Sequence, residues 1–554
     1  MSFGPEYIHG LQAALNEKLP WRVLKVEGGE SWVALRVSAL RVSGEGDGWF
    51  LLSWGRGSTG CCLADSASVE ALKRGASART HLAETLKSRL VKGQITTARQ
   101  LGHDRLLELE AVRFVAAGFS VRYFLVLEAT EPTGNLILLD GERRIEELAR
   151  HAPPDVNPYR TLLPGRLYIP PPAFQGPLPI EVEALTFEDV PRLRGVGRPL
   201  VRMIGDHWAE RPPSRWLEAL RLLYGDDDLP CMHTSKGYHT RFPFSFPEAE
   251  RDEGGALLAA RGGVLSPLLA RTRARLLHGL NARVERAVKS KERHLDGLRN
   301  QLKNNAEAEL FRRKGELLLT HLMEAPPWAD KITLREWEGG KLLEIALDSK
   351  LSPVQNAQRY FKKYKKARAD PRKIQEEASA LERAIEELRE QRDLLDSIKD
   401  LAQLEEAVKD VADWLAPQTE SGRKGGSGKR ASNTLPPHLR FQFEGYTVLV
   451  GLSARGNRYV TFRQATGDDL WLHAHEVPGA HVIIKGAKGR KELEGAPILT
   501  FAATLAAEYS KARGSLFVQV DYTERRCVRP VPGAVALVTY TNPGVIRVQG
   551  SLGA

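Results

Sequence analysis

Two segments with heptad spacing constrain the fold of this chain more than any other feature of its sequence. The first runs from Asn281 to Leu310, with apolar residues at Val288, Leu295, Leu298 and Leu302. The second follows a compact insert, and its apolar positions are Ile374, Ala378, Leu381, Ile385, Leu388 and Leu395. We predict an antiparallel coiled-coil arm over 281–415 with a small middle domain at its tip, over about 313–370. A second helix of roughly forty residues would reach about 60 Å.

The overall charge favours a polyanionic partner. Lys and Arg number 80 against 69 Asp and Glu in 554 residues, a formal net charge of +11. This balance favours nucleic acid before a membrane surface. The four cysteines lack metal-ligand spacing, and the adjacent Cys61 and Cys62 argue against a disulfide framework. Without a signal-peptide pattern or an apolar run of roughly eighteen residues, we expect a cytoplasmic protein with no membrane partner.

The N-terminal part alternates strand-like runs with helical segments, which predicts a mixed α/β domain over 1–172. Within it, Asp104 and Arg105 stand side by side at the entry to an apolar run. Adjacent residues on a strand face opposite ways, so a structural pair would bridge to different neighbours. The plain alternative is a solvated turn.

A glycine-rich run predicts a helix-hairpin-helix domain over 180–275. Gly195 and Gly197 separate two helical runs, and Arg194 and Arg198 flank them. The first turn of the second helix would expose backbone N–H groups to a phosphate, and glycine permits its close approach. A glycine hairpin is also a common packing device, so nucleic-acid backbone binding and plain structure both stay open.

The insert at the tip of the arm carries lysines among aromatic residues. Lys362 and Lys363 share a run with Tyr360, Phe361 and Tyr364. Basic residues interleaved with aromatic ones suit RNA contact, and the alternative is a helix with a solvated basic face. We expect the aromatic side chains to be buried and the lysines to contact RNA.

A flexible Gly/Ser-rich linker over 416–437 leads to a C-terminal α/β domain over 438–554. Strands are expected over 441–450 and 459–463, followed by a strand, a turn and a returning strand over 469–485. A run of small residues further on predicts a closely packed helix.

The first strand expected within 469–485 carries Asp469, Trp471 and His473, which alternate along the sequence and so project from one face of that strand. Indole, imidazole and carboxylate are groups that bind unstacked nucleotides. The alternative is a half-buried sheet with a core tryptophan and a satisfied histidine. No carboxylate or thiol completes a ligand set with His473, His475 and His481, so no metal is expected.

Four runs in this order resemble the NFACT family of bacterial ribosome quality control factors, historically labelled fibronectin-binding proteins. They are LRNQLKNNAEAELFRRKGELLLTHL, LDSKLSPVQNAQRYFKKYKKARA, DLWLHAHEVPGAHVII and SKARGSLFVQVDYT. The resemblance covers nearly the whole chain and is strongest from about residue 283 onward. It implies a multidomain α+β fold: an N-terminal domain similar to formamidopyrimidine-DNA glycosylases, a helix-hairpin-helix domain, a coiled-coil arm with a middle domain, and a C-terminal RNA-binding domain.

The resemblance also implies a function. Such proteins bind large ribosomal subunits, and hence rRNA, blocked by peptidyl-tRNA with its nascent chain. They recruit alanyl-tRNA for template-free alanine tailing, and a small RNA-binding protein of the same pathway is a further candidate partner. Asp104 and Arg105 fall on the family's tRNA-recognising pair, and Asp469, Trp471 and His473 on its Asp-x-Trp-x-His motif. The ribosome would perform peptidyl transfer, so we expect no catalytic residue and no cofactor.

Several positions depart from the family pattern. Members commonly begin MSFDG, whereas this chain has Gly4, with Glu6 as the nearby acid. The family's Arg-Asn-Asn run is Leu452 to Ala454 here, the Gly-Arg-His-Ser-Asn stretch keeps only Asn135, and Ala480 replaces a usual serine. Loss of polar groups at an RNA surface would relax tRNA selection, and drift is the alternative.

Two other function classes compete with this one. A glycosylase would need an N-terminal proline followed by an acidic residue, which Met1, Ser2 and Phe3 do not supply. A fibronectin-binding adhesin would need export and anchoring signals, which the sequence does not show.

Overall fold

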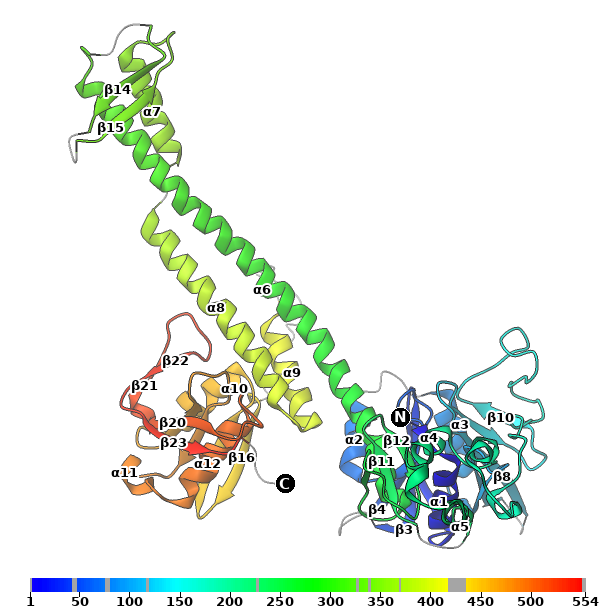
Figure 1. Ribbon diagram of the computed structural model, residues 1–554. Coiled ribbons are helices and arrows are strands. Elements are labelled where there is room, and N and C mark those ends of the chain that lie inside the picture. The colour runs from blue at the N-terminus through cyan, green and yellow to red at the C-terminus, as the bar shows by residue number, and fades with distance from the viewer. Residues whose placement is uncertain are drawn as a thin grey trace. The chain divides into compact units, whose positions relative to one another are not determined.

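The computed structural model describes residues 2–41, 47–74, 80–115, 119–225, 229–324, 328–336, 340–367, 370–416 and 435–550. The chain forms two compact units, Met1–Leu276 and Leu277–Ala554. Figure 1 shows the elements of each unit, which mix helices with largely antiparallel sheets. Across these described stretches, no helix has both the length and the apolar character to span a bilayer.

A nine-stranded antiparallel sheet frames the first unit, in the order β10-β9-β8-β7-β6-β2-β3-β4-β5. Its strands are β2 (Trp21–Gly29), β3 (Trp32–Arg41), β4 (Asp47–Ser53), β5 (Gly60–Ala64), β6 (Gln94–Gln100), β7 (Leu106–Phe114), β8 (Ser120–Glu128), β9 (Asn135–Leu139) and β10 (Ile145–Leu148). Helix α1 (Pro5–Asn16) packs on β6, α3 (His81–Leu90) on β2, and α2 (Ser66–Arg74) on β2 and β4. The predicted mixture of helices and strands is therefore present.

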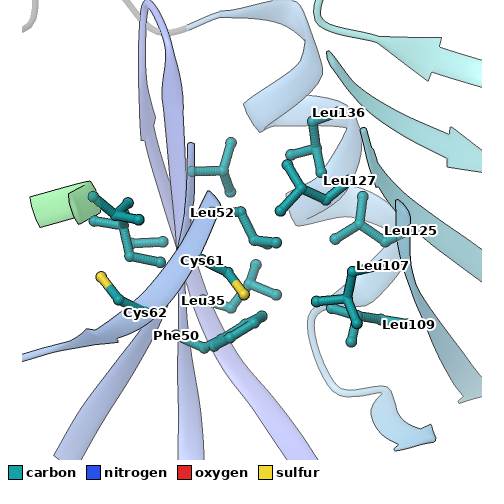
Figure 2. Close-up of a cluster of buried hydrophobic side chains, with 14 of the residues drawn as sticks. Leu35, Phe50, Leu52, Cys61, Cys62, Leu107, Leu109, Leu125, Leu127 and Leu136 are labelled. Carbon is teal, nitrogen blue, oxygen red and sulfur yellow. The ribbon is translucent and has the colours of Figure 1, made fainter. Parts of the chain in front are cut away.

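The core of this unit lies between β3, β4 and β5 on one side and β7, β8 and β9 on the other. Figure 2 shows the buried side chains from both sides facing one another, and they are Leu35, Phe50, Leu52, Cys61, Leu107, Leu109, Leu125, Leu127 and Leu136. Cys62 points to the opposite face of β5 and is buried there. Each fully buried leucine stabilises the fold by roughly 1.5 to 3 kcal/mol. Burial also raises the pKa of the Cys61 thiol, and that of Cys62 to about 12, so both cysteines behave as apolar core residues.

The chain's first strand belongs to a different sheet. Strand β1 (Ser2–Phe3) pairs in parallel with β12 (Tyr238–Arg241), in a four-stranded sheet of order β1-β12-β11-β13 with β11 (Cys231–Thr234) and β13 (Ala249–Arg251). The predicted 1–172 and 180–275 segments thus share a sheet. The expected first helix of the hairpin is a short 3-10 helix, η2 (Phe187–Arg192), and the second is α4 (Arg198–Asp206). Short elements η1 (Pro179–Glu181), η3 (Trp208–Glu210) and α5 (Pro213–Leu222) complete this region.

Helix α6 (Ala256–Thr320) forms one side of the predicted arm and α8 (Pro371–Ser397) the other. In the second unit the two helices run antiparallel, joined by the ion pairs Arg299–Glu382 at 3.0 Å and Arg389–Glu292 at 2.9 Å (Figure 1). Most of the predicted heptad positions are buried, including Val288, Leu295, Leu298, Ile374, Ile385, Leu388 and Leu395.

The helices of the arm differ from the prediction at their ends. The first begins at Ala256 rather than near 281, and the second ends at Ser397 instead of continuing over roughly forty residues. Asp400 explains the break, because its side chain accepts a hydrogen bond from the Gln403 N–H (2.8 Å) and caps a new helix, α9 (Leu401–Trp414). Helix α9 packs back against α8.

A small layer of two strands and a helix lies between the two arm helices in sequence. Strands β14 (Lys331–Arg335) and β15 (Leu342–Ala346) pair, and α7 (Pro353–Ala367) packs with them. The apolar core here joins the last turns of α6 to these elements, through Leu318, Leu334, Ile345, Ala357 and Tyr360.

The C-terminal part is a six-stranded antiparallel sheet of order β16-β17-β19-β18-β20-β23. Its strands are β16 (His438–Phe443), β17 (Tyr446–Gly451), β18 (Leu470–Ala474), β19 (Val482–Lys485), β20 (Val518–Glu524) and β23 (Gly544–Val548). Helix α12 (Pro497–Glu508), the predicted run of small residues, packs on one face. Helix α11 (Arg490–Leu493), the 3-10 turn η5 (Arg525–Cys527) and the hairpin of β21 (Val528–Pro530) with β22 (Val538–Tyr540) complete it.

The strand expected over 459–463 is wrong. This stretch is helical, as α10 (Ala454–Tyr459) followed by a π-helical turn, η4 (Val460–Gln464). Ser453 starts the helix, because its hydroxyl accepts a hydrogen bond from the Gly456 N–H at 2.9 Å. The predicted 416–437 linker lies largely outside the described residues, which omit 417–434.

Candidate nucleic-acid interface

The Asp104–Arg105 pair lies in the turn between β6 and β7, which matches neither a strand nor a fully solvated loop. The Asp104 carboxylate accepts a hydrogen bond from the Arg105 N–H (2.7 Å), and the Arg105 Nε lies 3.8 Å from the same oxygen. Gln100 holds the turn by donating to the carbonyls of Pro5 (2.7 Å) and Asp104 (2.8 Å). Both charged side chains remain partly exposed, so the turn presents an adjacent acid and base to a ligand.

The glycine hairpin packs against this part of the N-terminal domain. Gly195 has a φ of +83°, and a Cβ there would lie 2.3 Å from the Tyr224 hydroxyl oxygen. The Gly197 N–H, directly before α4, donates to the Glu6 carboxylate at 3.1 Å, so this group has a packing role. Phosphate binding at the start of α4 stays a prediction. The neighbouring Arg198 side chain is exposed, and Arg194 is partly exposed with Glu181 3.9 Å away.

Tyr224 brings the turn and the hairpin together. Its hydroxyl donates to the Gly195 carbonyl at 2.6 Å, and its ring lies 4.9 Å from the rings of both His9 and His103. Burial, and then the positive charge of Arg194, lowers the pKa of His103, the residue before Asp104. The two sites predicted separately, Asp104 with Arg105 and Arg194 with Arg198, therefore lie in one neighbourhood.

Glu6, in the first turn of α1, is the buried centre of this neighbourhood. Its carboxylate accepts hydrogen bonds from the hydroxyls of Tyr238 (2.6 Å) and Thr240 (2.7 Å), in addition to the Gly197 N–H. Burial raises the pKa of Glu6, and these donors oppose that shift. A Cβ on Gly4 would lie 1.8 Å from the Glu6 Oε1, so this carboxylate occupies the space that a side chain at position 4 would enter.

In the second unit, Asp469, Trp471 and His473 share a sheet face, as the alternation predicted, but this face is covered. Trp471 has 0% exposure and packs with Val460 and Val528, while Asp469 is 2% exposed. Asp469 accepts hydrogen bonds from the backbone N–H groups of Thr466 (2.7 Å) and Gly486 (2.9 Å). An exposed stacking platform at Trp471 is therefore wrong in this structure, and a role of the motif in RNA binding stays a prediction.

The histidines beside this motif have opposite environments. Burial lowers the pKa of His473 to about 4 and also holds the pKa of His481 well below its usual value. A hydrogen bond from His475 Nδ1 to the Asp521 carboxylate (2.7 Å) raises the pKa of His475 instead. In the parts of the chain that the structure describes, no three His, Cys, Asp or Glu side chains gather as a metal site.

The tip lysines lie on α7 as predicted. Lys362 and Lys363 are exposed, and the Lys363 Nζ lies 5.5 Å from the ring centroid of Phe311 and 5.4 Å from that of Tyr360. Burial of the aromatic residues is confirmed for Tyr360, which belongs to the tip core. RNA contact by the lysines stays a prediction.

The comparison with known families decides the relationship. A sequence profile described as the NFACT N-terminal and middle domains matches residues 39–202 and 269–424. The chain belongs to the NFACT family. A Streptococcus suis relative named Rqc2 homolog RqcH is 30% identical over 467 residues, 82% of each chain. The Bacillus subtilis protein of the same name is 27% identical over 510 residues, 84% of each.

Two solved structures are also similar to parts of this NFACT chain. The C-terminal part of the fibronectin/fibrinogen-binding protein from Streptococcus suis covers 50% of this chain and 94% of its own, with 26% identity and a TM-score of 0.34. The N-terminal part of that protein covers 48% of this chain and 97% of its own, with 22% identity and a TM-score of 0.37.

Several of the positions at which this NFACT chain departs from the resembled family pattern are buried. Ser453 caps α10 and also donates to the Asp410 carboxylate of α9 at 2.7 Å. Ala480 is fully buried, and Asn135, the residue of its stretch that is kept, is 3% exposed and donates to the Arg150 carbonyl at 2.8 Å. The departures at Ser453 and Ala480 therefore lie inside the domain, whereas Pro132 and Thr133, in the stretch before Asn135, are exposed.

Sequence patterns missed Tyr224 and Tyr238 and gave Glu6 only as a neighbouring acid. The Tyr238 bond to Glu6 joins residues 232 positions apart, and the Tyr224 bond joins residues 29 apart. Neither separation leaves a periodic signal. The one available clue is that glycines stand at positions 4, 195 and 197, where bulky neighbours require them.

We expect Gly4→Ala and Glu6→Ala to be strongly non-additive. Gly4→Ala alone forces its Cβ into the Glu6 carboxylate, and Glu6→Ala alone leaves three buried donors unsatisfied, so each costs about 2 to 4 kcal/mol. The double variant removes the collision with the carboxylate and keeps only the 2.3 Å approach to the Tyr238 hydroxyl, so its loss of unfolding free energy falls short of the sum. Urea unfolding of all three variants measures this. Gly262→Ala, which meets open space, is the control that should add to Glu6→Ala.

Trp471→Ala should destabilise the NFACT chain by about 3 to 5 kcal/mol, because the ring is fully buried. Trp328→Ala is the matched control, since that indole is 79% exposed, and we expect a change within about 0.5 kcal/mol. Unfolding would be followed by circular dichroism. If Trp471→Ala kept its unfolding free energy but lost affinity for RNA, the indole would not be a core residue, and stacking on a base would again explain the motif.

Acidification should weaken the fold through His473. Its folded pKa of about 4 lies below the unfolded value of about 6.5, so the unfolded state binds more protons between these values. Its contribution to stability is present above about pH 6.5 and is lost as pH falls toward 4. The unfolding free energy of His473→Gln should depend less on pH across this window than that of the unsubstituted protein. The same slope in both proteins would contradict the burial of His473, and His294→Gln on an exposed turn of α6 is the control.

Proposed function

We propose that this chain is a ribosome quality control factor. It would bind large ribosomal subunits carrying peptidyl-tRNA and recruit alanyl-tRNA for template-free tailing of the nascent chain. The observation that carries the proposal is the length of the relationship, since relatives named Rqc2 homolog RqcH match 82% to 84% of this chain and of their own. A shared single domain would not extend through both units.

The geometry of the first unit supports tRNA as a ligand. The partly exposed Asp104 and Arg105 side chains lie near Arg194 and the exposed Arg198, around Tyr224. Guanidinium groups attract phosphates, and the carboxylate beside them discriminates among donors on a base edge. Such a surface combines sequence-independent attraction with selectivity, as recognition of one tRNA requires.

In this proposal the protein acts by positioning. The ribosome carries the peptidyl transferase activity, so the factor needs to hold the acceptor tRNA in place rather than to supply an acid or a base. Its net charge of +11 contributes long-range attraction to ribosomal RNA. Lys362 and Lys363 at the tip of the arm are candidates for such contacts.

Asp104→Ala with Arg105→Ala should abolish tRNA association and leave subunit binding intact. The protein would be isolated from gently lysed native cells, and the accompanying RNAs would be sequenced. We expect large-subunit rRNA with one enriched tRNA family for the unsubstituted protein, and rRNA alone for the double variant. Glu142→Ala with Arg144→Ala, an exposed ion pair in the turn between β9 and β10, is the matched control. If the Asp104→Ala, Arg105→Ala variant still retained tRNA, these two residues would not recognise tRNA. If no RNA accompanied the unsubstituted protein, the proposed function would be wrong.

A further inference from the structure

The second face of the C-terminal sheet is open at one edge. Helix α12 covers the first face, and η4 with the β21–β22 hairpin covers Trp471 and Ile483 on the second. Strand β23 lies at the edge of the sheet beside β20. On these two strands the second face bears exposed side chains: Phe517, directly before β20, is 72% exposed, and Val545 is 51% exposed.

The strand register shows which side chains are neighbours on this face. Gln519 pairs with Arg547 and Asp521 with Val545, so these four side chains project to the same side. Alternation places Phe517 on that side as well, because Val518 points into the α12 core. His475 directly follows β18, and its N–H donates to the carbonyl of Gln519 on β20 at 2.9 Å. The His475 imidazole therefore lies on the same face of the sheet.

His475 is held in place and its charge is favoured. Its Nδ1 lies 2.7 Å from the Asp521 carboxylate, which also accepts a hydrogen bond from the Tyr540 hydroxyl at 2.5 Å. That pairing raises the pKa of His475, while 38% of its side chain remains exposed. Only Glu476, 3.8 Å from Nε2, competes for the outward-facing nitrogen among the described residues.

Arg547 supplies a cation on this face. It is exposed, and no carboxylate of the described residues forms an ion pair with it, unlike Arg526, which pairs with Asp468 at 2.9 Å. An aromatic ring on the same sheet face as an uncompensated guanidinium and a held imidazole suits a nucleotide, whose base stacks and whose phosphate is anionic. An apolar protein partner would gain nothing from these polar groups.

We propose that Phe517, His475 and Arg547 form a platform for an unpaired RNA nucleotide, with the base stacked on Phe517 and the phosphate held by the Arg547 guanidinium beside the His475 imidazole. This assignment rests on the proposed function, which supplies RNA as the partner. It moves the RNA-binding surface of the C-terminal domain from the covered Trp471 to the open edge of the same sheet face. A paired duplex would not fit the platform, because its bases are already stacked.

The test measures binding of full-length protein to a short labelled oligouridine, with a fully paired duplex of the same length as the comparison. Phe517→Ala should weaken oligouridine binding about 10-fold, and Phe517→Trp should keep or strengthen it. Arg547→Ala should also weaken binding and lower the dependence of log Kd on log salt by about 0.7. The neighbouring Leu516→Ala is the matched control, since Leu516 is 85% exposed but alternates to the other side.

Equal oligouridine affinity of Phe517→Ala and the unsubstituted protein would overturn the platform. Cross-linking in cells would identify any protein that contacts this face. If Phe517→Ala abolished such a cross-link and left oligouridine affinity unchanged, the face would bind a protein partner and the RNA assignment would be wrong. If large subunits co-isolate with the protein but oligouridine binding does not depend on Phe517, the platform is wrong and the proposed function is retained. Binding that depends on Phe517 without any co-isolated ribosomal RNA would support the platform and overturn the proposed function alone.

Discussion

The buried carboxylate of Glu6 is the group on which the candidate tRNA site of the first unit depends. It joins α1 to β12 through Tyr238 and Thr240, and to the glycine hairpin through the Gly197 N–H. A carboxylate without exposure is costly unless such donors surround it. Loss of any one donor therefore weakens the position of the others. The exposed Arg198 directly follows Gly197, so this buried contact also fixes the position of the Arg198 backbone.

The same contact explains a departure that looked like a loss. Sequence comparison with the family pattern shows Gly4 where an acidic residue is usual, which left that position without a charge. The structure places the Glu6 carboxylate where a side chain at position 4 would point. From the first turn of α1, the Glu6 side chain reaches back into that space. Glu6 therefore supplies a buried carboxylate beside position 4, where the resembled family pattern has an acidic residue.

Periodic patterns predicted much of the fold, and long-range contacts account for most of the errors. Heptad spacing identified Val288 and Leu388 as buried arm positions because that signal is local. It missed the end of α8 because one Asp400 cap outweighs a pattern that continues past it. Alternation correctly placed Trp471 and His473 on one face. It could not show that β21 and β22, some sixty residues later, cover that face.

The two proposed RNA-binding surfaces lie on separate units of one chain, which changes how much affinity each must contribute. Once one unit is bound to a ribosomal subunit, binding at the other becomes intramolecular and proceeds at a high effective concentration. A weak contact, such as one stacked base at Phe517, then suffices to hold the C-terminal domain on RNA. Isolated units should accordingly bind far more weakly than the intact chain. A platform of moderate affinity also releases RNA quickly, which suits the proposed function, in which a new tRNA would be accepted in every cycle of tailing.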